Sequence, residues 1–299
     1  MHRRAGVRGR LREPDRARRR GGAGSRGAPQ ARGSPAAVLV RSSVSWGVGL
    51  RGKTLGERAE ALVAEFGIET PGELEIEAIA FDSGVEVVYE AMSGCEASLV
   101  GYGNRAIATI NPSNIRGRER FSVGHELGHW HLHRGRSFEF RVDDPSANLS
   151  SDKTLEKEAD TFAAHLLMPS ALFKPAIAQI GQPNFQQLAK VADEFETSVM
   201  ATTLRLVGLN TLEVIVACYN ESGLRWYLPA LDVPRRWFLK DRLDEDTFAY
   251  DLLHNGKECK ALGKQSADAW FQNDDACNYE VREQCIGSTG HTVLVLLYL

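Results

Sequence analysis

The segment RFSVGHELGHWHLHRG, residues 120–135, contains four of the eight histidines in the chain. Phe121, His125, His129 and Leu132 follow one another at helical spacing and lie along one stripe of a helix. Because this stripe combines apolar side chains with the histidines, we expect it to be the buried face. The segment therefore predicts a helix that presents two imidazoles from its core-facing side.

Within this helix, residues 125–129 read His-Glu-Leu-Gly-His, which is the HExxH pattern. Two histidines four residues apart lie one turn apart on one face, so both can reach the same tetrahedral zinc ion. Glu126, next to the first histidine, is then placed to act as general base on a water molecule at the metal. The alternative interpretation is two helix histidines and a surface glutamate that share no role.

A catalytic zinc ion needs a third protein ligand and an open fourth position. The segment TLEKEADTFAAHLLMP, residues 154–169, is predicted to be helical and contains several side chains able to bind a metal. On a helical wheel, its apolar residues centre about 50° from Glu156 but more than about 100° from Glu158. Glu156 is therefore the acid that we expect to face the core and the metal.

The other polar side chains near the motif are expected to have supporting or structural roles. Asp160, one turn beyond Glu156, is either an acceptor for a ligand imidazole N–H or a solvated carboxylate. His165 falls on the polar side of its helix and is expected at the surface. His131 and His133 are rotated away from the metal face and are expected to be partly exposed, with His133 better placed for a further metal contact.

The composition is that of an ordinary soluble protein. Of the 299 residues, 43% are hydrophobic and 25% are charged, and no apolar run is long enough to span a membrane. The five cysteines are odd in number and lack the spacing of a metal site, which favours the reducing cytoplasm. No apolar segment follows the basic N-terminus, so a secretory signal peptide is not predicted.

The charge is divided unevenly along the chain. Residues 1–53 hold fourteen basic residues against Glu13 and Asp15, a balance of +12, which leaves −15 for the remainder of a chain whose net charge is −3. Because phosphate contacts need Lys and Arg, the body of the protein is a poor candidate to bind DNA. Residues 1–52 are rich in Arg and Gly and are expected to be disordered, as a nucleic-acid-binding arm, a transit peptide or a tail without a function.

The hydrophobic pattern predicts an α+β protein with three ordered parts. Residues 53–182 combine a first helix, the strands GVEVVYEAM and RAIATINP, and the two helices that carry the metal-binding motifs. Residues 183–209 contain two short helices joined by a turn at Glu196. Residues 210–299 contain strands such as LEVIVACYN and HTVLVLLYL and form a C-terminal α+β domain.

The two motifs together resemble the ImmA/IrrE family of metallopeptidases, whose signature joins HExxH to ExxAxxFAxxLLMP. Here RFSVGHELGHWHLH and EKEADTFAAHLLMP match it, 27 residues apart from His129 to Glu156. The resemblance implies a small zincin-like domain with His125, His129 and Glu156 as zinc ligands and Glu126 as the catalytic base. Asp160 stands where many relatives have Asn, which leaves its supporting role open.

The resemblance covers roughly residues 54–180 and extends in outline beyond them. Residues 183–209 match the helix-turn-helix-like segment of IrrE-type members, and residues 210–299 resemble a further domain that is described there as GAF-like. Enzymes of the family cleave XRE-type helix-turn-helix repressors, which relieves repression during mobile-element induction or the response to DNA damage. The resemblance therefore implies a zinc cofactor, with Mn²⁺ as the alternative, a repressor as partner and substrate, and a cytoplasmic location.

Two further expectations concern partners. The strand RAIATIN, residues 105–111, is expected to offer an edge on which an extended substrate pairs. A non-catalytic regulator that uses the metal structurally and binds DNA or a partner through residues 183–209 is the alternative function. Since only Arg205 is basic after Thr197, direct DNA binding is not expected, and a structural or protein-docking role is favoured for this segment.

Overall fold

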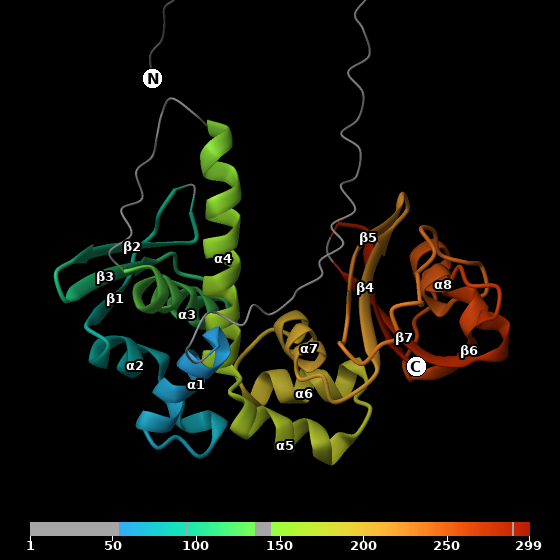
Figure 1. Ribbon diagram of the computed structural model, residues 1–299, viewed down its shortest axis with the longest axis horizontal. Helices are drawn as coiled ribbons and strands as arrows, with labels where there is room; N and C mark the ends of the chain where they lie inside the picture. The colour runs from blue at the N-terminus through green and yellow to red at the C-terminus, as the bar shows by residue number, and fades with distance from the viewer. Residues whose placement is uncertain (1–53, 94, 135–144, 289) are drawn as a thin grey trace, which may run out of the picture. The chain divides into compact units, whose positions relative to one another are not determined.

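The computed structural model describes residues 54–93, 95–134, 145–288 and 290–299. The tail predicted at residues 1–52 lies outside the described residues. The described part contains eight α-helices and two β-sheets, which confirms the predicted α+β class (Figure 1). None of its helices has the length and apolar character needed to cross a membrane.

The N-terminal part is built from four α-helices, one short 3-10 helix and a three-stranded sheet. Its elements are α1 (Leu55–Glu65), η1 (Pro71–Glu73), α2 (Ile76–Asp82), β1 (Val85–Tyr89), β2 (Ala97–Tyr102), β3 (Arg105–Ile110), α3 (Arg116–His133) and α4 (Pro145–Leu167). Helix α1 begins at a capping box, in which the Thr54 hydroxyl accepts from the backbone N–H of Glu57 and the Glu57 carboxylate accepts from that of Thr54.

The strand order β1-β3-β2 corrects the expectation that residues 105–111 form the open edge. Strand β3 is central, since it pairs in parallel with β1 and antiparallel with β2. Its alternate residues Ala106, Ala108 and Ile110 are buried. The open edge beside α3 is β2, which the hydrophobic pattern did not predict. The half of β2 that ends at Tyr102 is exposed, so it lacks the alternation that marks a strand in sequence.

Helices α3 and α4 pack against each other through very small residues. A Cβ on Gly128 would lie 2.8 Å from the Cα and 3.0 Å from the carbonyl oxygen of Ala159, and both groups belong to the backbone of α4. One turn earlier, Gly124 faces Ala163 in a looser contact. The backbones of the two helices therefore approach as closely as glycine allows, and this sets the distance between the side chains that they carry.

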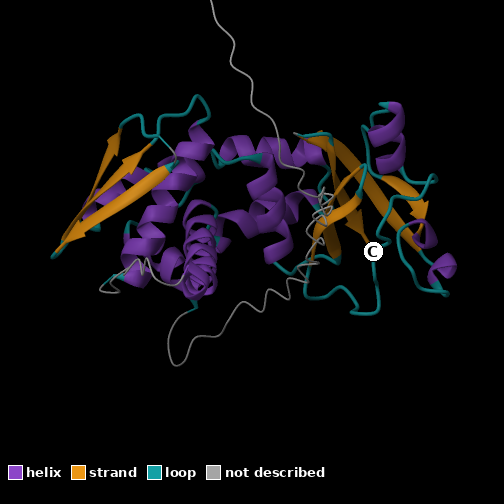
Figure 2. Cartoon of the chain, turned by 90° about the horizontal axis from the view of Figure 1, so that it is seen from above, coloured by secondary structure: helices purple, strands orange, loops and turns teal. Residues whose placement is uncertain are grey.

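The remaining elements are three α-helices, followed by a five-stranded antiparallel sheet with a fourth α-helix and two 3-10 helices between its strands. They are α5 (Ser170–Ile180), α6 (Phe185–Glu194), α7 (Val199–Gly208), β4 (Val214–Asn220), β5 (Gly223–Pro229), α8 (Phe248–Asn255), β6 (Gly263–Ser266), η2 (Ala267–Ala269), η3 (Ala276–Asn278), β7 (Glu280–Ser288) and β8 (Thr292–Tyr298). The strand order is β5-β4-β8-β7-β6. Figure 2 shows the strands of the chain gathered in two separate sheets.

One hydrophobic core joins α5, α6 and α7 to this second sheet. Its buried side chains run from Met168 through Phe173, Leu188 and Leu206 to the central strand β8, whereas a separate core holds residues 59–167. The buried Gln284 of β7 accepts a hydrogen bond of 2.6 Å from the backbone N–H of Phe185 at the start of α6. The helix-turn-helix-like segment is thus packed into the C-terminal core.

The packing of α3 on α4 makes a prediction for Gly128→Ala. Alanine gains helix propensity over glycine by about 1 kcal/mol, yet here its Cβ must push away the backbone at Ala159. We expect a net loss of about 1–3 kcal/mol in the free energy of unfolding, measured by urea denaturation.

Gly124→Ala is the matched control, since its Cβ would meet the Cβ of Ala163 at 3.2 Å, a contact that a small shift relieves. Both substitutions gain the same propensity, so the difference between them isolates the close approach. Equal stabilities of the two variants would contradict the packing argument.

Candidate metal centre

Helices α3 and α4 bring His125, His129 and Glu156 together in a group that is able to hold a metal ion. His125 Nε2 lies 3.1 Å from His129 Nε2 and 3.1 Å from a carboxylate oxygen of Glu156. His129 Nε2 lies 3.4 Å from the other oxygen of Glu156. The two imidazoles come from consecutive turns of α3, as their spacing predicts, and the carboxylate reaches them from the neighbouring helix.

These three distances fit a tetrahedral zinc site. Zinc binds imidazole nitrogen and carboxylate oxygen at about 2.0–2.2 Å, which puts neighbouring ligand atoms of a tetrahedron about 3.3 Å apart. The Glu156 side chain is 56% exposed, whereas those of the histidines are 18% and 12% exposed. The wheel argument placed Glu156 toward the core; it lies instead at the open side of the group, where a fourth position is accessible.

Asp160 determines which nitrogen of His125 carries the proton. Its Oδ1 lies 2.9 Å from His125 Nδ1. Because a carboxylate only accepts hydrogen bonds, the Nδ1 of His125 is the donor, and in the neutral ring Nε2 then bears a lone pair. Burial lowers the pKa of His125, but the hydrogen bond with Asp160 and the negative charges of Asp160, Glu126 and Glu156 together raise it above its usual value.

His133 and Glu158 act in the same way on His129. The Nε2 of His133 lies 2.9 Å from a carboxylate oxygen of Glu158, so it is the donor, and the Nδ1 of a neutral His133 accepts. That Nδ1 lies 3.0 Å from His129 Nδ1, which must then donate. The Nε2 of His129 is left with a lone pair, and burial together with the neighbouring His125 lowers the pKa of His129, which favours the neutral ring.

The donor set therefore suits a divalent cation. Two imidazole lone pairs and a carboxylate converge within hydrogen-bond distance, although none of these three atoms has a proton to offer the others in the tautomers described above. Three converging acceptors repel one another unless a cation lies between them. Imidazole and carboxylate ligands, each held by a further hydrogen bond, are typical of zinc sites in proteins.

Glu126 lies on the buried side of the same helix turn and is 6% exposed. Burial raises the pKa of Glu126 to about 7, while the positive charge of His125 opposes the rise. A bound divalent cation acts in the same direction as His125 and favours the carboxylate. The structure thus places a buried carboxyl one residue from the ligand His125, in the position of a general base for a water molecule at the metal.

Two other histidines, His133 and His165, are less exposed than their positions in the sequence predict. His133 was expected to be partly exposed, but it is 2% exposed because α4 covers it and supplies Glu158. His165 was expected at the surface, but it is half-buried and its Nδ1 lies 2.7 Å from the Glu60 carboxylate of α1. His131 is exposed and its Nε2 contacts the Ser83 hydroxyl at 3.0 Å.

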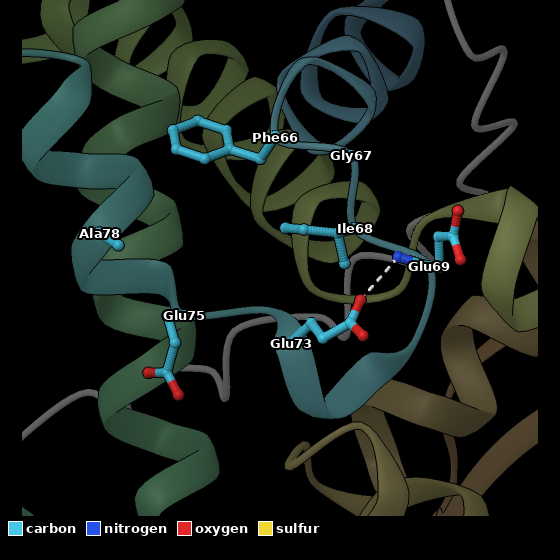
Figure 3. Close-up of a pocket in the computed structure, with 7 residues that line it drawn as sticks. All are labelled: Phe66, Gly67, Ile68, Glu69, Glu73, Glu75 and Ala78. Carbon is cyan, nitrogen blue, oxygen red and sulfur yellow. Dashed lines mark hydrogen bonds between the residues drawn. The ribbon is translucent and has the colours of Figure 1, made fainter.

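An acidic hollow between α1 and α2 is formed without any of the metal-binding residues (Figure 3). Its lining includes Glu69, Glu73 and Glu75, but the Glu73 carboxylate accepts hydrogen bonds from the backbone N–H groups of Glu69 and Thr70. These hydrogen bonds lower the pKa of Glu73. The carboxylate of Glu73 thus serves the turn around η1, and we assign the hollow no chemical role.

The site makes a graded prediction for metal affinity. Glu156→Ala removes a ligand and is expected to abolish stoichiometric zinc binding. Glu158→Ala keeps all three ligands but frees His133, so we expect one zinc equivalent bound about 10–100-fold more weakly. A competition titration with a chromophoric chelator measures both, and His131→Gln, on the same helix and outside the group, serves as control. Wild-type affinity in Glu158→Ala would contradict the hydrogen-bond chain.

Comparison with known proteins agrees with this geometry. Residues 80–207 match the IrrE N-terminal-like domain of peptidase family M78. A solved structure described as a Mycobacterium tuberculosis transcriptional regulator has a similar fold, with a TM-score of 0.57, 15% sequence identity, and coverage of 81% of this chain and 74% of that one. A search of curated proteins found no match. The matched residues begin in α2 and end in α7, so they include both metal-bearing helices, and residues 80–207 of this chain are an IrrE N-terminal-like domain of the peptidase M78 type.

Proposed function

We propose that the protein is a zinc-dependent endopeptidase, with Mn²⁺ as the alternative metal. The observation that carries this proposal is the buried carboxyl of Glu126 beside the group of His125, His129 and Glu156. A purely structural metal needs no such carboxyl, and structural zinc sites commonly use cysteine. The five cysteines, by contrast, are all free and take no part in the group.

The residues of the site have distinct roles in this proposal. Zinc, when bound, supplies a Lewis acid that polarises the peptide carbonyl and stabilises the negative charge developing on it. Glu126 accepts a proton from the attacking water and returns it to the leaving nitrogen. Asp160 and the His133–Glu158 pair hold the two ligand imidazoles in the orientation and tautomer that binding requires.

The edge of β2 is the surface on which an extended substrate would pair. Among the described residues, this strand has a partner on one side only, is in contact with α3, and exposes Val100 by 70% and Tyr102 by 93%. An unpaired edge offers backbone N–H and C=O groups to a peptide and so recognises it largely independently of sequence. Selectivity must therefore come from pockets beside the strand.

We further propose that the substrate is a transcriptional repressor of the XRE type with a helix-turn-helix domain, cleaved in the cytoplasm. Support comes from the IrrE N-terminal-like domain, and the free state of the five cysteines suits a reducing compartment. Cleavage would separate the DNA-binding part of the repressor from the rest and relieve repression in a stress, DNA-damage or mobile-element response.

The alternative of a DNA-binding regulator is disfavoured by α7, the helix that would read the major groove. None of residues 199–209 is exposed, so this helix has no free face to present to DNA. Its one cation, Arg205, is buried and donates to Glu60 and to the carbonyl oxygen of Met168, at 3.1 and 3.0 Å. A helix without free cations lacks the phosphate contacts that supply most DNA affinity.

The direct test is Glu126→Gln, assayed against the repressor encoded nearest the gene by mass mapping of the fragments. We expect cleavage to slow by about 10²–10⁴-fold, since an amide cannot accept the proton, while one equivalent of zinc stays bound. Glu86→Gln, the same change at an exposed position on β1, should leave the rate unchanged. Undiminished cleavage by metal-loaded Glu126→Gln would exclude the proposed base.

A further inference from the structure

A large groove lies between α3, α4 and α7, close to the metal group. It encloses about 670 Å³, within the range of about 300–1,000 Å³ that is usual for ligand pockets. Phe121, one turn before His125, and Asp160, which contacts His125, belong both to this groove and to the surroundings of the metal. The three metal-binding residues do not line the groove, which begins at the residues beside His125.

The side of the groove away from the metal is formed by α7. Its lining includes Met200, Ala201, Leu204 and Gly208, at the three- and four-residue spacing of one helix face, with Leu228 of β5 beside them. The helix-turn-helix-like segment thus turns this face of α7 toward α3 and α4. Met200, Ala201 and Leu228 also pack against the C-terminal core, so none of the residues of α7 is exposed.

Leu204 is the residue of this face that most strongly indicates a ligand-binding surface. It is half-buried and lines the groove, yet it belongs to neither hydrophobic core and is absent from the half-buried residues packed against them in the described part of the chain. Opposite it lie Phe121 and Ala164, and Ile115 at the edge of the groove is 52% exposed. When an apolar ligand covers apolar side chains that are partly in contact with water, the free energy of the complex is lowered.

The charges around the groove are balanced. Arg118, Lys157 and Arg205 line the groove with Glu96 and Asp160. Arg118 lies 4.0 Å from the Glu96 carboxylate, and the charge of Arg205 is offset by Glu60 at 3.1 Å, outside the lining. A polyanion such as nucleic acid requires an excess of cations, which this balance does not leave. Glu96 also immediately precedes β2, so a peptide paired along the β2 edge would reach the groove at the start of that strand.

We infer that this groove is the specificity site of the enzyme and binds an apolar segment of the peptide substrate next to the cleaved bond. The inference rests on the proposed peptidase function and adds the substrate chemistry: Leu, Ile, Met or Phe side chains on one side of the cleaved bond, contacted by Phe121, Met200 and Leu204. The backbone of the substrate pairs with β2, and the groove selects its side chains.

The test uses zinc-loaded Glu126→Gln as a trap, with a randomised library of twelve-residue peptides as the probe. We expect the selected peptides to be enriched in apolar residues at two or more neighbouring positions. Adding Met200→Gln and Leu204→Gln should weaken their binding at least tenfold. Val199→Gln is the matched control, since Val199 is half-buried on the same helix but does not line the groove, and binding should stay within twofold.

Cleavage of the selected peptides by the zinc-loaded wild-type chain separates this inference from the proposed function. Peptides that bind through the groove without being cleaved support the groove as a peptide site and count against the peptidase. A second outcome is that the peptides are cleaved but bind Glu126→Gln equally tightly with and without Met200→Gln and Leu204→Gln. This outcome would overturn the specificity site and leave the peptidase function supported. Selection of charged peptides, or of none, also overturns the inference.

Discussion

The close approach of two helix backbones at Gly128 and Ala159 is the constraint on which the candidate metal centre depends. With a Cβ at residue 128, α4 would have to move away from α3, and Glu156, one turn before the contact, would move with it. The present spacing leaves the Glu156 carboxylate within 3.1 and 3.4 Å of the two imidazoles. The glycine inside the HExxH motif is therefore part of the site geometry, although it has no functional group.

The hydrogen bonds behind the ligands complete what the helix packing begins. Asp160 fixes one imidazole, and Glu158 fixes the other through His133, so that both lone pairs point toward Glu156. Converging acceptors cost free energy in the metal-free protein, and the same arrangement makes metal binding favourable. Zinc should thus stabilise the folded chain as well as serve catalysis, because a ligand that binds only the native state shifts the folding equilibrium toward it.

The sequence allowed the central group to be predicted because its geometry is largely local. Two histidines four residues apart share a face in any helix. The helical wheel singled out Glu156, although it expected this carboxylate to face the core and the side chain is 56% exposed. The role of His133 depends on Glu158 of another helix, so the spacing within α3 alone could not reveal it. Strand β2 escaped prediction because it lacks buried alternation, and its Gly101 packs close to the Trp130 ring of α3.

The charge of residues 183–209 argued against DNA binding and favoured a structural or protein-docking role, but the neighbours of α7 follow from the tertiary fold and could not be predicted. The central claim remains that two imidazoles and one carboxylate hold zinc with a position left open. X-ray absorption at the zinc edge of the loaded protein tests it most directly. The claim predicts a shell of nitrogen and oxygen at about 2.0–2.1 Å with two imidazoles. Sulfur at about 2.3 Å, or a third imidazole from His133, would contradict it.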